Sequence, residues 1–127
     1  MTILHNGNIG IGVTEPNEKL VVNGRICATD VYVQLFGSPC WGDYVFSDNY
    51  ELTNLNELEQ FIKENKHLPD IPSTTEVETN GIQLGEMQGK LLRKIEELTL
   101  YVIQLKKDNE SLKSRINKLE NKKAGKK

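Results

Sequence analysis

The chain has 127 residues, with only three Phe, four Tyr and one Trp, which predicts one small domain plus an extended helix rather than a large core. The net charge is −2, but residues 106–127 hold nine Lys or Arg against three acidic residues, leaving −8 on the first 105. This basic end has no interleaved aromatic residues, which argues against nucleic-acid binding, and no apolar run predicts membrane insertion.

Residues 1–36 predict a β-strand head. Asn6-Gly7 and Asn23-Gly24 are hairpin-type turn signals. Short β-branched segments surround them, at residues 9–13, 19–22 and 25–33. Gly10 and Gly12 alternate with Ile, which indicates that backbones approach closely there. A phosphate-binding loop is the alternative, but neither a Lys-Ser/Thr pair nor a helix follows.

Residues 37–83 predict an aromatic loop followed by short helices. In the loop, Trp41 and Tyr44 form a possible ligand surface that could stack on sugars, although packing at the junction of head and stalk is favoured. Asn54 precedes Glu57 by three residues, which is a capping-box pattern, and a helix is expected at about 55–65. Its apolar face is formed by Leu55, Leu58, Phe61 and Ile62.

A second capping box begins at Ser73, with Glu76 at its third helical position. It predicts a short helix that ends at Asn80-Gly81, because glycine readily terminates helices. The segment 67–72 contains two prolines, so an extended path is expected there.

No set of side chains in the sequence predicts catalysis, a metal site or a cofactor. His67 has no Cys or Ser partner at a recognisable spacing, so a packed or capping histidine is expected. Cys27 and Cys40 lie 13 residues apart, which favours buried or idle thiols and leaves a single disulfide open. The acidic pairs of the helices, Glu96-Glu97 among them, are expected on solvated faces.

Residues 84–121 predict a coiled-coil stalk, followed by a basic, disordered tail at 122–127. The two seam positions of the heptad, a and d, keep their 4-3 spacing for four heptads. The predicted oligomer core consists of Leu91, Ile95, Leu98, Val102, Leu105, Asn109, Leu112, Ile116 and Leu119. Because such a helix is not stable alone, its partner is expected to be another copy of this chain.

Residues in and beside the seam indicate how many helices the coiled coil contains. β-branched residues at a, Leu at d and a single Asn109 at a all favour a dimer. Leu92 at e widens the apolar stripe, and the six residues from Arg115 to Glu120 match a trimerisation signature. In it, Arg115 covers the core and forms an inter-chain ion pair with Glu120. A parallel homotrimer is predicted, with a dimer as the alternative.

Several sequence blocks occur in order along the chain: GNIGIG at 7–12, LVVNGRI at 20–26, WGDYVF at 41–46, HLPDIPS at 67–73 and KIEELTLY at 94–101. Together they resemble the C-terminal domain of phage tail fibres and fibre-like bacterial surface proteins. The resemblance covers nearly the whole chain. It implies a homotrimeric fibre tip, on a virion or a bacterial surface, with β-segments from three chains wound together above a three-helix bundle.

The layout also resembles the intramolecular chaperone domain of endosialidase-type tailspikes, which cut their own chain just before a Ser-Asp pair. Ser47-Asp48 is such a pair, but Glu51 and Leu52 stand where that family has an assisting Lys. Without a nearby base or cation a serine hydroxyl is a poor nucleophile, so Ser47 is expected to be a loop residue.

The sequence therefore predicts an α+β protein with a small β-rich intertwined head, a short α-linker and a parallel trimeric C-terminal coiled coil. The expected function is structural and non-enzymatic: trimerisation and nucleation of fibre folding. The first alternative is a fibre tip that binds a receptor or cell-surface glycan, since three copies would add avidity to weak binding. Self-cleavage is the less favoured alternative.

Overall fold

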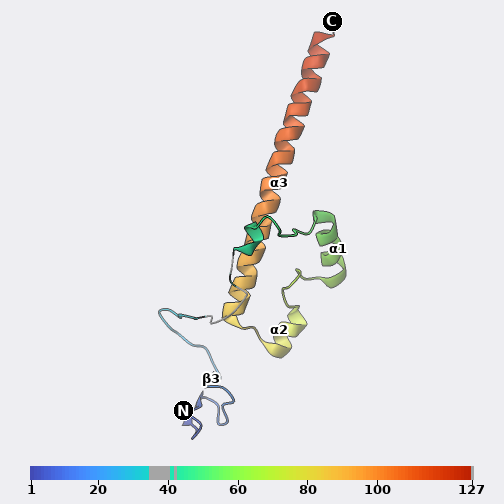
Figure 1. Cartoon of the computed structure of the whole chain (residues 1–127). Helices are drawn as coiled ribbons and strands as arrows, with labels where there is room; N and C mark the ends of the chain where they lie inside the picture. Colours follow the sequence, from blue (N-terminus) through green and yellow to red (C-terminus); the bar gives the residue numbers. More distant parts are fainter. Residues whose placement is uncertain (35–40, 42, 127) are drawn as a thin grey trace. The chain divides into compact units, whose positions relative to one another are not determined.

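The computed structural model describes residues 1–34, 41 and 43–126 (Figure 1). The chain divides into two compact units, Met1–Val33 with the strands and Gln34–Lys127 with the helices. The predicted α+β class is confirmed. Residues 35–36 of the predicted head, residues 37–40 and 42 of the predicted loop, with Cys40 among them, and Lys127 of the predicted tail lie outside the described residues. Among the described helices, none has the length and apolar character that a membrane crossing requires.

Unit 1 contains one small sheet of three strands. They are β1 (Thr2–Ile3), β2 (Ile9–Ile11) and β3 (Leu20–Val22), in that spatial order. β1 and β2 are antiparallel, and the predicted turn at Asn6-Gly7 joins them, with Gly7 at a φ of 82° that favours glycine. β2 and β3 are parallel, a pairing that the turn signals did not predict.

The loop between β2 and β3 folds back closely on β2. A Cβ on Gly10 would lie 2.3 Å from the carbonyl oxygen of Val13, so only glycine fits there. The buried Asn8 secures the loop, since its side-chain amide donates a 3.0 Å hydrogen bond to the carbonyl oxygen of Pro16. The predicted close backbone approach at the alternating glycines is confirmed at Gly10.

The predicted strand at 25–33 is not formed in the single chain. Its apolar residues Ile26, Val31, Tyr32 and Val33 are all exposed. A strand forms only where a neighbouring strand satisfies its backbone groups, and among the described residues β3 is the last strand. β-branched composition alone was therefore insufficient evidence for a strand.

Unit 2 begins with a short 3₁₀ turn and two short helices: η1 (Tyr44–Phe46), α1 (Leu55–Asn65) and α2 (Thr74–Asn80). Both predicted N-caps are confirmed, but of the two predicted capping boxes only the one at Ser73 has both of its hydrogen bonds. Asn54 accepts a 2.9 Å hydrogen bond from the backbone N–H of Glu57, and both bonds of the Ser73–Glu76 capping box are present. The hydrogen bond that the Ser73 backbone N–H donates lowers the pKa of Glu76.

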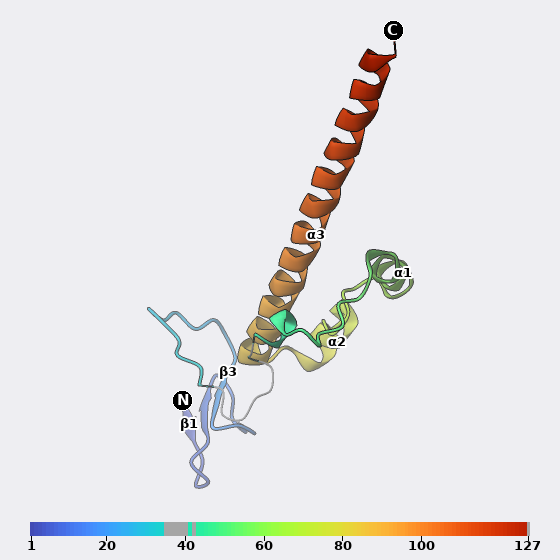
Figure 2. The same cartoon turned by 45° about the horizontal axis from the view of Figure 1, so that its top comes forward.

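The last helix, α3 (Leu84–Gly125), has 42 residues and is therefore about 63 Å long. It begins where predicted but continues beyond residue 121, into the segment predicted to be disordered. Lys122 and Lys123 lie in its last turn, where cations interact favourably with the helix dipole. In two views the C-terminal half of α3 has no other element of unit 2 beside it (Figures 1 and 2).

Apart from Pro16, Val45 is the one buried apolar side chain among the described residues, with 1% of its surface exposed. It belongs to η1, which packs on α3. A single copy of this chain therefore buries very little apolar surface, and most of its large apolar side chains remain in contact with water.

Candidate assembly surface of the long helix

The heptad seam of α3 is uncovered along its whole length. All nine predicted core positions are exposed: Leu91, Ile95, Leu98, Val102, Leu105, Asn109, Leu112, Ile116 and Leu119. For the eight apolar ones, the exposed fraction runs from 48% at Leu91 to 64% at Leu119. A long apolar stripe of this kind, interrupted at Asn109, is typical of an assembly surface.

The chain itself packs on another side of α3. The two buried residues of this helix, Gly89 and Glu96, both occupy heptad position b, away from the a/d seam. The contact with η1 is made on this side, where Val45 is buried. The fold of the chain thus leaves the seam free for another molecule.

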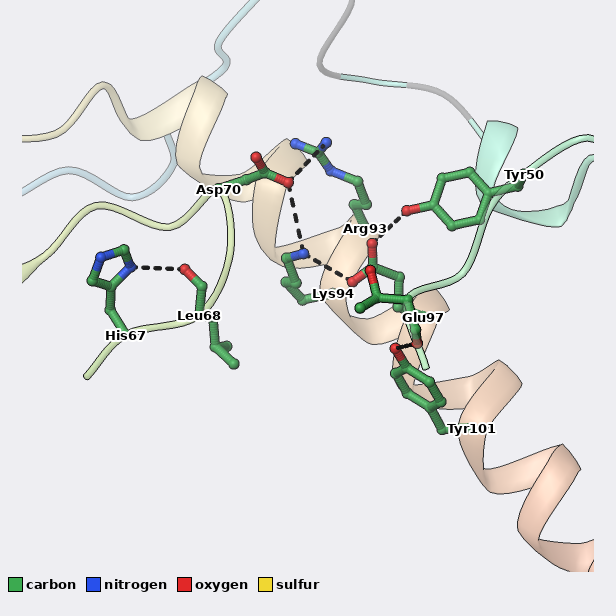
Figure 3. A network of polar contacts seen from close by, with 9 residues as sticks. Tyr50, His67, Leu68, Asp70, Arg93, Lys94, Glu97 and Tyr101 are labelled. Carbon is green, nitrogen blue, oxygen red and sulfur yellow. Dashed lines mark hydrogen bonds and ion pairs between the residues drawn. The ribbon is translucent and has the colours of Figure 1, made fainter. Parts of the chain in front are cut away.

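A polar network ties the preceding segment to α3 (Figure 3). The Tyr50 hydroxyl donates to the Glu97 carboxylate, and Lys94 Nζ lies 2.9 Å from the same carboxylate. Asp70 lies 3.6 Å from the guanidinium of Arg93 and 3.9 Å from Lys94 Nζ. These contacts join two distant parts of the chain to two turns of one helix.

The tyrosines of this network have altered acidity. Burial, and then the hydrogen bond with Glu97, raise the pKa of Tyr50 well above its usual range. Burial and the Glu97 charge also raise the pKa of Tyr101, whose hydroxyl donates to the Thr53 carbonyl oxygen. Both hydroxyls therefore keep their protons to a higher pH than a free tyrosine does.

The prediction that Glu96 lies on a solvated face is wrong. Only 6% of its surface is exposed, because η1 covers this side of the helix. Loss of hydration, and then the nearby Asp43 carboxylate, raise the pKa of Glu96. Its Oε2 atom and the Nε atom of Arg93 are buried without a hydrogen-bond partner, so this contact includes uncompensated polar groups.

The two predicted ligand-surface residues lie in different environments. Tyr44 belongs to η1 and faces Tyr50 at 6.0 Å between ring centroids, with the Arg93 guanidinium 6.0 Å from its ring. Trp41 is 58% exposed, against 39% for Tyr44. Tyr44 is therefore part of the contact with α3, whereas Trp41 offers a free aromatic surface.

The predicted ion-pair residues Arg115 and Glu120 are both exposed on α3. Five residues apart on one helix, they lie on different faces, so a bond between them requires two helices. Intrachain contacts nearby involve other residues, such as Lys106 with Glu110 at 3.7 Å. The predicted inter-chain pairing is thus compatible with the geometry of α3.

The residues that the sequence offered as candidates for catalysis, disulfide formation or metal binding have the following environments. The Ser47 hydroxyl donates a 2.7 Å hydrogen bond to the Tyr44 carbonyl oxygen. His67 packs edge-on against Phe61 with 5.7 Å between the rings. Cys27 is exposed with a free thiol. Within the described ranges, no cluster of three or more His, Cys, Asp or Glu could hold a metal ion.

Three comparisons, with protein-family models, with curated proteins and with solved structures, found no match to this chain. Function is therefore inferred from the sequence and from the arrangement of its residues.

Proposed function

We propose that this chain is a non-enzymatic trimerisation and folding-nucleation module at the C-terminal end of a phage tail fibre or a fibre-like bacterial surface protein. One observation carries the proposal: the nine-position seam of α3 is exposed while the chain packs on another side of the same helix. The resemblance of the ordered sequence blocks supplies the fibre context, on a virion or at a cell surface.

Burial of the seam gives the driving force for assembly. Each exposed Leu, Ile or Val of the seam is worth about 1–2 kcal/mol when a neighbouring helix covers its remaining surface. Arg115 and Glu120, at g and e, favour a parallel arrangement, because g of one helix meets e of the next, and the trimerisation signature that they bound favours three helices. Asn109 at a favours a dimer, which is the alternative stoichiometry.

A preassembled stalk would also assist folding of the head. The strands of unit 1 have only two or three residues each, so the sheet is small and its stability low. Bringing three chains together at α3 raises their effective concentration at the head and lowers the entropic cost of contacts between chains. Assembly would thus precede and promote folding of the fibre.

Light scattering on a sizing column tests the proposal. One chain weighs 14.4 kDa and three weigh about 43 kDa. We expect a trimer for the wild type and a monomer for Leu98→Asp with Leu105→Asp, which places carboxylates in the seam. The control, Ser111→Asp with Ser114→Asp, adds the same charge at outer positions and should remain trimeric. A trimer of the Leu98/Leu105 variant would refute the heptad assignment.

A receptor- or glycan-binding tip is the second candidate, and the 58% exposure of Trp41 favours it. Exposed aromatic rings stack on the apolar faces of sugars, and three copies would add avidity. A glycan array probed with the wild type and with Trp41→Ala should show signals that the variant loses. An array without signals at high protein concentration would leave the structural function alone.

A further inference from the structure

Residues 50–73, here called the arm, are attached to α3 at both ends but not between them. Tyr50 and Thr53 are hydrogen-bonded to α3 at the start of the arm, and Asp70 is ion-paired to it near the end (Figure 3). All these anchors lie within residues 93–101. In between, no Cα atom of α1 lies within 8 Å of a Cα atom of α3, so the two helices do not pack together.

The arm carries an apolar helix face that the chain covers only in part, through His67 on Phe61. α1 has no buried residue, and Leu55 and Ile62 are 46% and 39% exposed. Leu58 lies on the same face and is half-buried. An 11-residue helix is marginal in water by itself and normally depends on packing of its apolar face. A partner for this face would explain why the sequence forms α1.

The space beside the arm is continuous with the seam. Leu52 and Leu55 of the arm, with Leu100 and Ile103 of α3, line an open apolar groove whose wall also includes Leu105. Leu105 is a d position of the heptad. A second helix seated on the seam at this level would therefore also reach the groove and the arm beside it.

The charges of the arm suit a copy of α3. Three glutamates, Glu57, Glu59 and Glu64, lie on α1 against one basic residue, Lys63. In a parallel coiled coil, the g position at Tyr101 faces the e position of the neighbouring helix five residues further on. That position is Lys106, so a neighbouring copy brings a cation to the acidic arm.

We propose that the arm clasps a second copy of this chain, with the apolar face of α1 covering the neighbouring α3 beside the seam. The inference rests on the proposed function and deepens it, because it assigns an occupant to the groove. Each α3 is then held by its own arm through polar anchors and by the neighbour's arm through apolar contacts. The arm would also confine the neighbour to one register.

Site-specific photocrosslinking tests the clasp. We would place benzoylphenylalanine at Ile62 on the apolar face or, as a control, at Gln60 on the opposite face of α1. Light scattering would give the mass before irradiation, and denaturing gels would then show covalent products. We expect a trimer in both cases, and crosslinked pairs of chains from Ile62 at least tenfold more abundant than from Gln60.

The two proposals fail in different ways. A trimer that yields no interchain product from Ile62 would overturn the clasp and leave the assembly function standing. A monomer would overturn both. As a second measurement, Leu55→Ser with Ile62→Ser should raise the concentration at which the trimer dissociates by about tenfold or more, whereas Asn56→Ser with Gln60→Ser should not. If the two variant trimers dissociated at the same concentration, the clasp would be contradicted.

Discussion

Truncation of Leu112 tests the seam at a place free of other contacts. Leu112 occupies a d position, is 52% exposed in the single chain and lies beyond the anchors at 93–101. Full burial of a leucine is worth about 1.5–3 kcal/mol, so covering its exposed half contributes about 1 kcal/mol or somewhat more per chain. Because three copies change together, Leu112→Ala should weaken a trimer by about 2–4 kcal/mol.

This loss corresponds to a fall in the overall association constant of between about 30-fold and about 1,000-fold. Sedimentation equilibrium over a dilution series would measure it, with Ser114→Ala, at an outer position, as the control. Alanine is the best helix former, so the change does not weaken the helix itself. Equal association constants for Leu112→Ala and Ser114→Ala would refute the placement of Leu112 between helices.

Two further predictions concern charged groups. The raised pKa of Glu96 means that its contribution to stability is present below the unfolded value of 4.5 and is lost as the pH rises through the raised value. Glu96→Gln should therefore raise the melting temperature at pH 7 and flatten its pH dependence. Glu110→Gln, at an exposed position, should do neither. The same dependence of melting temperature on pH in both variants would contradict the burial of Glu96. Arg115→Glu should weaken the trimer by about 1–3 kcal/mol, and adding Glu120→Arg should restore it; a double variant as weak as the single one would exclude the pair.

The helices of unit 2 could be predicted because their signals are local. Asn54 and Ser73 cap the two short helices through hydrogen bonds to residues three positions away, so neighbours in sequence contain the whole interaction. The start of α3 near Leu84 was predicted just after the Asn80-Gly81 stop, and the heptad spacing from Leu91 onward predicted that the helix is long. The continuation through Lys122 was missed because a run of lysines resembles a solvated tail, whereas the helix dipole favours it.

The strands were less predictable because their hydrogen bonds come from distant residues. The segment 25–33 has the composition of a strand but pairs with no strand of the described residues, and the parallel pairing of β2 with β3 had no sequence signal.

Part of the candidate site could likewise be predicted from local sequence, and part could not. The seam positions followed from spacing alone, and their exposure in the single chain agrees with an assembly surface. The burial of Val45 and Glu96 was not predicted, because it depends on which face of α3 packs against η1. Nothing in the Glu96-Glu97 pair distinguishes a covered carboxylate from a solvated one, since heptad position b is polar in most coiled coils.

The short span of the anchors has a consequence for the architecture of the stalk. Every described hydrogen bond and ion pair between the arm and α3 lies within residues 93–101, so the helix from Asn109 onward makes no such contact with the arm. Its length is then a free variable, provided that residues are gained or lost in steps of seven, which preserve the phase of the stripe. Insertion or deletion of whole heptads after Asn109 would therefore change the length of the stalk without altering the contacts between the arm and α3.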